Sequence, residues 1–505
     1  MKSWSTTRSD TIAVGVVVAV AICLRLPGLD RSLWFDECIY STTWIVKRWQ
    51  DLIPYTLGRV EAPAYRVFMF LWTNLFGESE IALRLPSVFC AGLSLYLTFQ
   101  IAAKWMGGRV VAYLAIILLA VSPVHVWYSR EATPYGTLLF AFLCSVYAYL
   151  RLCDQGPSRR WLLMYLGAST YAVFSHFFVA GILPFFVLMA WIRSRRLGLW
   201  MLMGNGAILG ALGVLLVVRS MRSTLRLSQR FLGEFDLTTW ADLYFSWFSG
   251  AGYSFAYLGR FSLIAAICGV ILGAFFLLRR RPSFRMETTG FLCGLPLVLL
   301  LLTLVGRKHF YIHRYLLVTL PFYCILCAGS VECFQKRLGK WIMASILVTA
   351  SIIPLGSVYY FGQDRWLVYK PNPDWKATTQ FVKQRETVKD QGGLWVFGDN
   401  CHLDSLARYM ELASVATKII PLRRCGVYHG SPRARREYYW EPPPGTQGTA
   451  LFVENIWWRR DVRSRIAAWP RFAFRRTWRF PGVEVHEFEV QAEQGTVVQQ
   501  NQGAR

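Results

Sequence analysis

The sequence lacks the short motifs by which proteins usually hold metals and nucleotides. Its twelve cysteines form no repeated CxxC pair, which excludes a zinc ribbon. It has no HExxH motif and no glycine-rich phosphate-binding loop. Five of the cysteines lie inside apolar runs, where a small buried side chain is the simpler interpretation: Cys23, Cys144, Cys268, Cys293 and Cys324.

Charged residues are also scarce, at 17% of the 505 residues, while 54% are hydrophobic. A soluble enzyme of this length is rarely so apolar, and the composition indicates a membrane protein. The formal net charge of +25 fits basic cytoplasmic loops as well as it fits nucleic-acid binding. The first apolar stretch has no small-residue cleavage site, so we expect a retained helix and not a removed signal peptide.

Apolar runs long enough to cross a bilayer recur along most of the chain. A spanning helix needs about 20 mostly apolar residues. About eleven segments approach that criterion, near residues 10–27, 83–103, 110–127, 134–151, 161–174, 176–192, 199–218, 260–278, 288–305, 315–333 and 341–361.

Every second connection between these segments is short and basic. The positive-inside rule places such connections in the cytoplasm. The N-terminus is then inside, and an odd number of spans places the C-terminal tail outside. The basic residues concerned are Lys2, Arg8, Lys104, Arg109, Arg151, Arg159, Arg160, Arg193, Arg195, Arg196, Arg279, Arg280, Arg281, Arg285, Lys336, Arg337 and Lys340.

The outer connections are longer, and the first of them covers residues 28–82. Within it, Tyr40–Ile53 and Ala64–Phe76 carry apolar and polar residues at helical spacing but are too short to span. They are typical of amphipathic helices lying along the membrane interface. A pair of ordinary packing helices is the alternative.

The tail is polar and predicts a second domain. Its short apolar runs LWVFGD, TALFVEN and VEVHEFEV suit strands, and Asp374–Gln384 and Leu403–Leu412 suit helices. We therefore predict a membrane domain at 1–361 and a small α/β domain at 362–505, with a disordered end of about ten residues. Cys401 and Cys425 would pair only if this domain faces an oxidising compartment.

Charged residues gather at the outer ends of the predicted spans. Asp36 and Glu37 are adjacent acids after the first span, Arg130 and Glu131 follow the third, and further basic residues precede the tenth. Arginine and lysine suit a phosphate, while a carboxylate suits the deprotonation of a hydroxyl. If these ends converge, the cavity would fit a substrate with an anionic head and a lipid tail.

Several motifs recur in one order and spacing: SLWFDE, EAPAYR, GESEIALRLPSV, SPVHVWYSREATPYGTLL, YAVFSHFF and HRYLLVTLP. Over about residues 10–360, this set resembles the lipid-linked glycosyltransferases of the GT-C superfamily. It is similar to glycosyltransferase family 39 and its relatives, the protein-mannosyltransferase-like and aminoarabinose-transferase-like branch. Single motifs such as DE are weak, but the ordered set is specific.

The resemblance implies that a sugar moves from a polyprenyl-phosphate donor to an acceptor hydroxyl on the outer membrane face, with inversion. It implies a multi-pass protein of the bacterial cytoplasmic membrane whose acceptor is a lipid, a glycan or a protein. No nucleic acid is implied as a partner. No cofactor is expected to be required; a divalent metal is possible in an acid-rich site but is not expected, because relatives in this branch generally do without one for catalysis.

The resemblance also assigns residues to roles. Asp36 maps to the catalytic base and Glu37 to its partner. The residues implied for the donor phosphate are Arg130, Arg314, Lys308 and His176, and those implied for the sugar or acceptor are Glu61, Tyr65, Glu131 and Tyr135. The chain departs from the family where Glu61 replaces a frequent histidine and where Thr133 replaces a second basic residue.

Other interpretations remain open. Asp36 and Glu37 would also suit a helix N-cap, and Arg130 and Glu131 a local ion pair. A transporter or flippase of lipid-linked sugars is the main alternative function, although such proteins typically show internal repeats and none is visible here. A non-catalytic membrane scaffold that presents the outer domain is a third.

Overall fold

The computed structural model describes residues 7–40, 46, 48–58, 62–221, 256–280, 287, 290–291, 294–298, 301, 313–359, 373–387, 393–398, 403–417, 419–421, 447–455, 462–467 and 471–491. The chain divides into two compact units. One combines Met1–Asp30 with Tyr40–Lys370, and the other combines Arg31–Ile39 with Pro371–Arg505.

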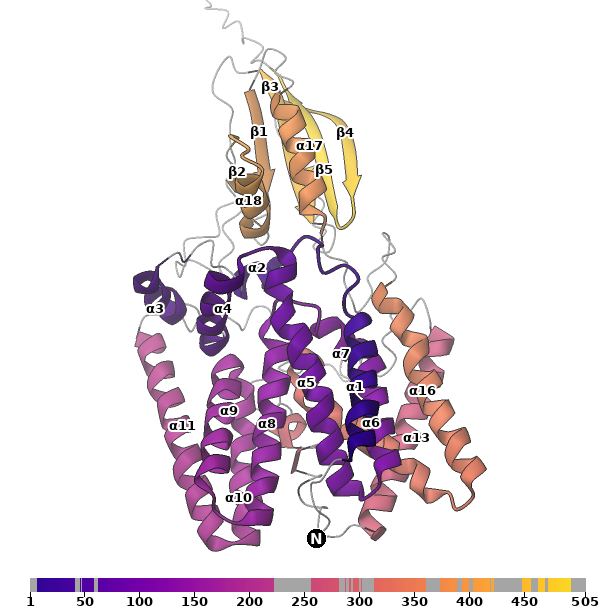
Figure 1. The fold of residues 1–505 in the computed structure, drawn as a ribbon. Helices are drawn as coiled ribbons and strands as arrows, with labels where there is room; N and C mark the ends of the chain where they lie inside the picture. The colour runs from indigo at the N-terminus through magenta and orange to yellow at the C-terminus, as the bar shows by residue number, and fades with distance from the viewer. Residues whose placement is uncertain are drawn as a thin grey trace, which may run out of the picture. The chain divides into compact units, whose positions relative to one another are not determined.

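The first unit is a bundle of helices (Figure 1). Thr7 opens its first helix with a capping box, in which the Thr7 hydroxyl accepts from the Asp10 backbone and the Asp10 carboxylate accepts from the Thr7 backbone. The helices described are α1 (Arg8–Cys23), α3 (Trp49–Gly58), α4 (Pro63–Phe76), α5 (Glu80–Met106), α6 (Arg109–Val121), α7 (Pro123–Tyr128), α8 (Pro134–Gln155), α9 (Arg159–Ser175), η1 (Phe177–Ile182), α10 (Leu183–Arg193), α11 (Arg195–Met221), α13 (Ala256–Arg280), η4 (His313–Thr319), α15 (Leu320–Gly329), η5 (Ser330–Cys333) and α16 (Arg337–Tyr359).

Six helical segments of the described chain are long and apolar enough to cross a bilayer: Glu80–Met106, Pro134–Gln155, Arg195–Val218, Arg260–Arg279, Arg314–Cys333 and Arg337–Gly356. Two shorter apolar segments are Arg109–Val121 and Phe177–Arg193. Each predicted span coincides with a helix or a helical pair, except 288–305, which lies largely outside the described residues. The fold is therefore that of a mainly helical membrane protein, and the number of spans stays a prediction.

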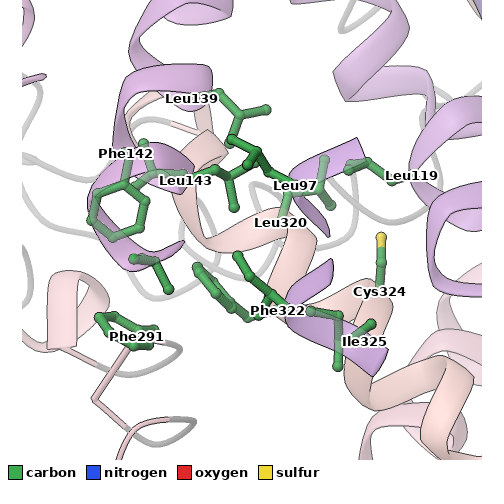
Figure 2. Packing of buried hydrophobic residues seen from close by; sticks show 14 of the residues in the cluster. Leu97, Leu119, Leu139, Phe142, Leu143, Phe291, Leu320, Phe322, Cys324 and Ile325 are labelled. Atoms are coloured by element: carbon green, nitrogen blue, oxygen red, sulfur yellow. The ribbon is translucent and has the colours of Figure 1, made fainter. Parts of the chain in front are cut away.

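The bundle core is apolar and rich in aromatic rings. Figure 2 shows Phe142 of α8, Phe322 of α15 and Phe291 close to one another, with leucines of α5, α6 and α8 around them. The centroids of Phe291 and Phe322 lie 5.4 Å apart in a stacked arrangement. Helices α5 and α8 also approach closely, since a Cβ on Gly136 would lie 2.9 Å from the Cβ of Ser87. Glycine at this position therefore permits the two helices to touch.

The first outer connection is helical in part. The expected helix at Ala64–Phe76 is confirmed as α4, which starts after Ala62 in a left-handed conformation with φ 50° and has Pro63 in its first turn. The expected helix at Tyr40–Ile53 is wrong in its bounds, because α3 begins at Trp49 and continues to Gly58. Two signals favour this start: Asp51 lies in the first turn of α3, and its carboxylate accepts from Arg48 Nε at 3.1 Å.

The second unit contains a five-stranded sheet in the order β2-β1-β3-β5-β4. Strand β1 is parallel to β2 and β3, whereas β5 is antiparallel to β3 and β4. The strands are β1 (Gly393–Gly398), β2 (Ile419–Pro421), β3 (Gly448–Asn455), β4 (Phe472–Phe480) and β5 (Val483–Val490), and the helices of the unit are α2 (Phe35–Tyr40), α17 (Trp375–Thr387), α18 (Leu403–Leu412) and α19 (Val462–Ala467). Cys401, Cys425 and the last residues lie outside the described residues.

The sheet buries both faces. Consecutive residues such as Val396 and Phe397 belong to different hydrophobic clusters, because successive side chains of a strand point to opposite faces. Helices α17 and α18 supply Trp375, Leu406 and Met410 to the cluster on one face. Helix α19 supplies Ile466 to the other. The predicted α/β composition of the tail thus matches the elements found.

Candidate active site

The two adjacent acids lie in the short helix α2 but have different surroundings. The Glu37 side chain is fully buried, and its Oε2 accepts from the Trp34 backbone N–H at 3.1 Å. Trp34 begins this helix, since its carbonyl accepts the first helical hydrogen bond from the Cys38 N–H at 3.0 Å. Glu37 therefore caps the helix that carries both acids. Asp36 is partly exposed, so of the two it is the side chain with access to solvent.

Three residues assigned from the motifs gather in the bundle. Tyr135 lies in the first turn of α8, His176 between α9 and η1, and Arg314 in η4. The Arg314 guanidinium carbon is 5.7 Å from the centre of the Tyr135 ring and 5.8 Å from that of Tyr315. The His176 ring centre lies 4.5 Å from Tyr315 and 5.9 Å from Tyr135. We call these four residues the arginine–aromatic cluster.

The members of the arginine–aromatic cluster come from separate parts of the chain, and the helix that carries each one restricts its position. Pro134 starts α8 and sets the direction of Tyr135. The Tyr135 ring also packs edge to face against Tyr128 of α7, at 5.3 Å between centroids. His176 has an extended backbone that ends α9 and starts η1. The cluster thus brings together side chains that lie more than a hundred residues apart in sequence.

The segment after α7 carries Arg130 and Glu131 in different environments. Arg130 is partly exposed and donates from Nη2 to the Pro27 carbonyl. The Glu131 side chain is buried, and its Oε2 accepts from Thr133 Oγ1 at 3.5 Å. The Glu131 carbonyl also accepts from the Ser87 hydroxyl at 2.7 Å.

Arg25 is a residue of this region that the sequence analysis missed. It is fully buried, and it donates from Nε to Ser129 Oγ at 2.6 Å and from Nη2 to His125 Nδ1 at 2.8 Å. Its Nη1 also donates to the carbonyls of Ala21 and Ala120. Arg25 therefore fastens the end of α1 to the residue that precedes Arg130. A charged residue inside the predicted span 10–27 is the signal that could have found it.

Tyr65 connects α4 to the rest of the bundle through aromatic contacts. It is fully buried, with its ring centre 6.3 Å from both Tyr40 and Phe68. Phe68 in turn packs at right angles to Tyr171 of α9, whose hydroxyl donates to Thr137 Oγ1 of α8 at 2.9 Å. Glu61 and Lys308 lie outside the described residues.

The described residues include no group of three or more His, Cys, Asp or Glu side chains able to hold a metal ion. The expectation that catalysis needs no cofactor stays a prediction. Chemically, a partly exposed carboxylate and two arginines at helix ends suit proton abstraction and the binding of an anionic group.

The comparison with protein families matches one segment of the chain. Residues 60–221 fit the family described as dolichyl-phosphate-mannose-protein mannosyltransferase. The match runs from before α4 to the end of α11 and includes Arg130, Tyr135 and His176. It leaves Asp36 and Arg314 outside. No curated protein matches the sequence.

Two solved structures of ArnT from Cupriavidus metallidurans are similar to this chain over nearly its whole length. The apo structure has a TM-score of 0.55 at 12% identity, and the structure bound to undecaprenyl phosphate has 0.54 at 13%. Both comparisons cover 96% of this chain and 99% of that one. At such identity the likeness shows a shared fold. Together with the family match, it confirms the resemblance inferred from the motifs.

Proposed function

We propose that this chain, which has the GT-C fold and the sequence pattern of the protein-mannosyltransferase-like and aminoarabinose-transferase-like branch, is a membrane glycosyltransferase that uses a polyprenyl-phosphate sugar. The family match and the shared fold support the general class. The donor, the inverting course, the outer-face site and the bacterial inner membrane are parts of the proposal. So are a cytoplasmic N-terminus and an extracytoplasmic C-terminal domain.

The arginine–aromatic cluster is the observation that carries the proposal. Its guanidinium lies near the rings of Tyr135 and Tyr315, so packing against two aromatic side chains restricts Arg314. A fixed guanidinium recognises a phosphate through paired hydrogen bonds. The aromatic rings around it shield that interaction from water, which strengthens it. We assign this cluster to the phosphate of the donor, together with Arg130 and, by resemblance, Lys308.

The reaction follows from these assignments. Asp36 takes the proton from the acceptor hydroxyl as its oxygen attacks the anomeric carbon. The bond from that carbon to the phosphate oxygen breaks, and the polyprenyl phosphate leaves with the electron pair. The arginines neutralise the charge that builds on the leaving phosphate, and such groups often contribute the largest share of catalysis. Glu37 holds the helix that carries Asp36, while Tyr135 and, by resemblance, Glu61, Tyr65 and Glu131 bound the sugar and acceptor side.

Binding of undecaprenyl phosphate by the purified protein tests this assignment. We expect the Arg314→Gln variant to bind it at least about tenfold more weakly than the wild type, since a charge-assisted pair is lost. Arg337→Gln is the matched control, because Arg337 is exposed at the start of α16 and should leave affinity unchanged. Undecaprenol, which lacks the phosphate, should bind both proteins equally. Equal affinity of the wild type and Arg314→Gln for undecaprenyl phosphate would remove the arginine–aromatic cluster from donor binding.

A further variant, Asp36→Asn, addresses the flippase alternative. A flippase moves its lipid without breaking the sugar–phosphate bond, so an Asp36→Asn variant would keep that activity. Loss of sugar transfer in Asp36→Asn, with donor binding retained, favours the enzyme.

A further inference from the structure

The segment that carries the two acids belongs to the same compact unit as the C-terminal domain. Arg31–Ile39 groups with Pro371–Arg505, although more than three hundred residues separate them. The boundary predicted from the sequence placed this segment in the membrane domain. The residues that contact this segment in the C-terminal domain therefore lie close in structure to the two acids.

Two hydrogen bonds attach the segment to the C-terminal domain. The Leu33 backbone N–H donates to the Tyr409 hydroxyl at 2.7 Å, and the Lys376 backbone N–H donates to Ser32 Oγ at 3.2 Å. Leu33 is fully buried, and Ser32 and Tyr409 are each 4% exposed. The bond from Leu33 to Tyr409 is buried, so water does not replace a lost partner there, whereas the bond from Lys376 to Ser32 is partly buried.

The domain core holds Tyr409 in place. Its helix α18 is amphipathic, and Leu406, Tyr409 and Met410 belong to one hydrophobic cluster with residues of β1, β3 and β5. Lys376 lies in the first turn of α17, whose Trp375 is buried in the same cluster. The two groups that contact the segment thus come from helices packed on one face of the sheet.

The contact lies directly before the helix of the acids. Leu33 is followed by Trp34, which starts α2 and receives the Glu37 cap. Asp36 is in the first turn of that helix. Fixing the Leu33 N–H therefore restrains the start of α2 and the backbone position from which the Asp36 side chain extends.

We propose that the C-terminal domain is a positioning element of the active site, and that Tyr409 acts through Leu33 to orient Asp36. This inference depends on the proposed function, because it assumes that Asp36 removes the acceptor proton. Tyr409 is a positioning residue and does not touch the substrate. A small misplacement of a catalytic base lowers the rate of the chemical step more than it lowers binding.

Tyr409→Phe tests the inference with little change in packing, since only the hydroxyl is removed. Ser405→Ala is the matched control. Ser405 lies one helical turn earlier on α18, is fully buried, and its hydroxyl has no hydrogen-bond partner among the described residues. Ser32→Ala removes the other contact, the hydrogen bond from the Lys376 N–H to the Ser32 hydroxyl. It tests the inference independently if Tyr409→Phe does not fold.

The first measurement is hydrogen exchange of the full-length protein, followed on peptides that cover residues 31–40. We expect Tyr409→Phe and Ser32→Ala to speed exchange in this segment while leaving the β1 and β3 peptides unchanged. Ser405→Ala should exchange like the wild type. Unchanged exchange in the segment for Tyr409→Phe would overturn the inference.

The second measurement is the transfer rate, with polyprenyl-phosphate sugars extracted from cells lacking the protein as donor and their membranes as acceptor. We expect Tyr409→Phe to lower the maximal rate about tenfold and to leave the apparent KM for the donor extract within about twofold. If Tyr409 had a purely structural role, Tyr409→Phe would lower the amount of folded protein, and the maximal rate per folded molecule would stay at the wild-type value. If Tyr409→Phe loses exchange protection but keeps the wild-type maximal rate, Tyr409 is not a positioning residue. The same conclusion follows if Ser405→Ala lowers the maximal rate as much as Tyr409→Phe does. Full activity of Asp36→Asn would instead overturn the proposed function, because the exchange result for Tyr409→Phe does not depend on activity.

Discussion

At the scale of single residues, Asp36 and Glu37 show why adjacent acids in a motif need not share a role. Glu37 is buried and accepts a backbone hydrogen bond, whereas Asp36 is partly exposed. The sequence left open whether these acids cap a helix or perform chemistry. Glu37 has the capping role. The helix that it caps is α2, and not the helix predicted at Tyr40–Ile53. The catalytic role proposed for Asp36 is compatible with it.

Arg25 gives a prediction at the same scale. Replacing it with methionine keeps an apolar stem of similar length but removes the donors to Ser129, His125 and two carbonyls. Because these acceptors are buried, we expect a loss of stability on the order of 2–4 kcal/mol. Thermal unfolding of the purified protein measures it.

The matched control for this change is Arg8→Met, since Arg8 is exposed on the same helix α1. It should unfold at the wild-type temperature. If Arg25→Met also unfolds at that temperature, the hydrogen bonds of Arg25 do not stabilise the bundle.

At the scale of elements, β5 carries an acid whose charge should stabilise the second unit. Glu487 is 8% exposed, and its Oε2 accepts from Trp478 Nε1 at 2.8 Å and from Arg476 Nε at 2.9 Å. Burial alone would raise the pKa of this carboxyl, but the hydrogen bonds from Trp478 and Arg476 and the charge of Arg385 hold it below the usual 4.5. The ionised form is therefore favoured in the folded domain.

This lowered pKa predicts the direction of a pH dependence. The stabilisation is complete above the unfolded pKa of about 4.5 and is lost as the pH falls through the lower folded value. We expect Glu487→Gln to weaken hydrogen-exchange protection of β4 and β5 at pH 7 by about 1.5 kcal/mol, at the low end for charged hydrogen bonds because Arg476 is half exposed. Below pH 4.5, the difference in exchange protection between Glu487→Gln and the wild type should become smaller, because Glu487 is then increasingly protonated in the wild type.

Glu489→Gln is the control on the same strand, because the pair of Glu489 with Arg475 is about half exposed on both sides. Exposed pairs contribute little, so its effect should stay below about 0.5 kcal/mol. Equal effects of the two substitutions would contradict the account of Glu487.

The elements also show how far the sequence could predict the structure. Strands β1, β3 and β5 and helices α17 and α18 follow from local hydrophobic patterns, and they were predicted near their observed bounds. Strand β4 was missed because its run FAFRRTWRF carries three arginines, which hide the alternation, and a register shift lies between Phe474 and Arg476. The start of α3 was misplaced because Trp49 sits in a stretch of mixed polarity without a clear cap.

Long-range contacts were beyond the sequence. The arginine–aromatic cluster was expected only in outline, from the motif resemblance, and packing of α8, α9 and η4 decides which rings surround Arg314. The pairing of Leu33 with Tyr409 joins residues 376 positions apart, and no local pattern predicts it. Arg25 was treated as part of a span, because its side-chain partners Ser129 and His125 lie about a hundred residues away.

At the scale of the whole molecule, the chain combines a helical membrane unit with a second unit that includes the acid-bearing segment, and it shares its fold with ArnT from Cupriavidus metallidurans. The roles proposed for the two units are complementary. The proposed phosphate-binding residues Arg314 and Arg130 belong to the first unit, and the proposed base Asp36 belongs to the second.

Mass spectrometry of membrane lipids and glycans tests the central claim most directly. Cells that make the wild type, the Asp36→Asn variant or no protein are compared for polyprenyl-phosphate sugars and for glycosylated products. We expect the wild type alone to form the product, with Asp36→Asn at least about a hundredfold slower and the donor accumulating as in cells without the protein. Product formation by Asp36→Asn at the wild-type level, or unchanged donors and glycans in cells that lack the protein, would contradict the account.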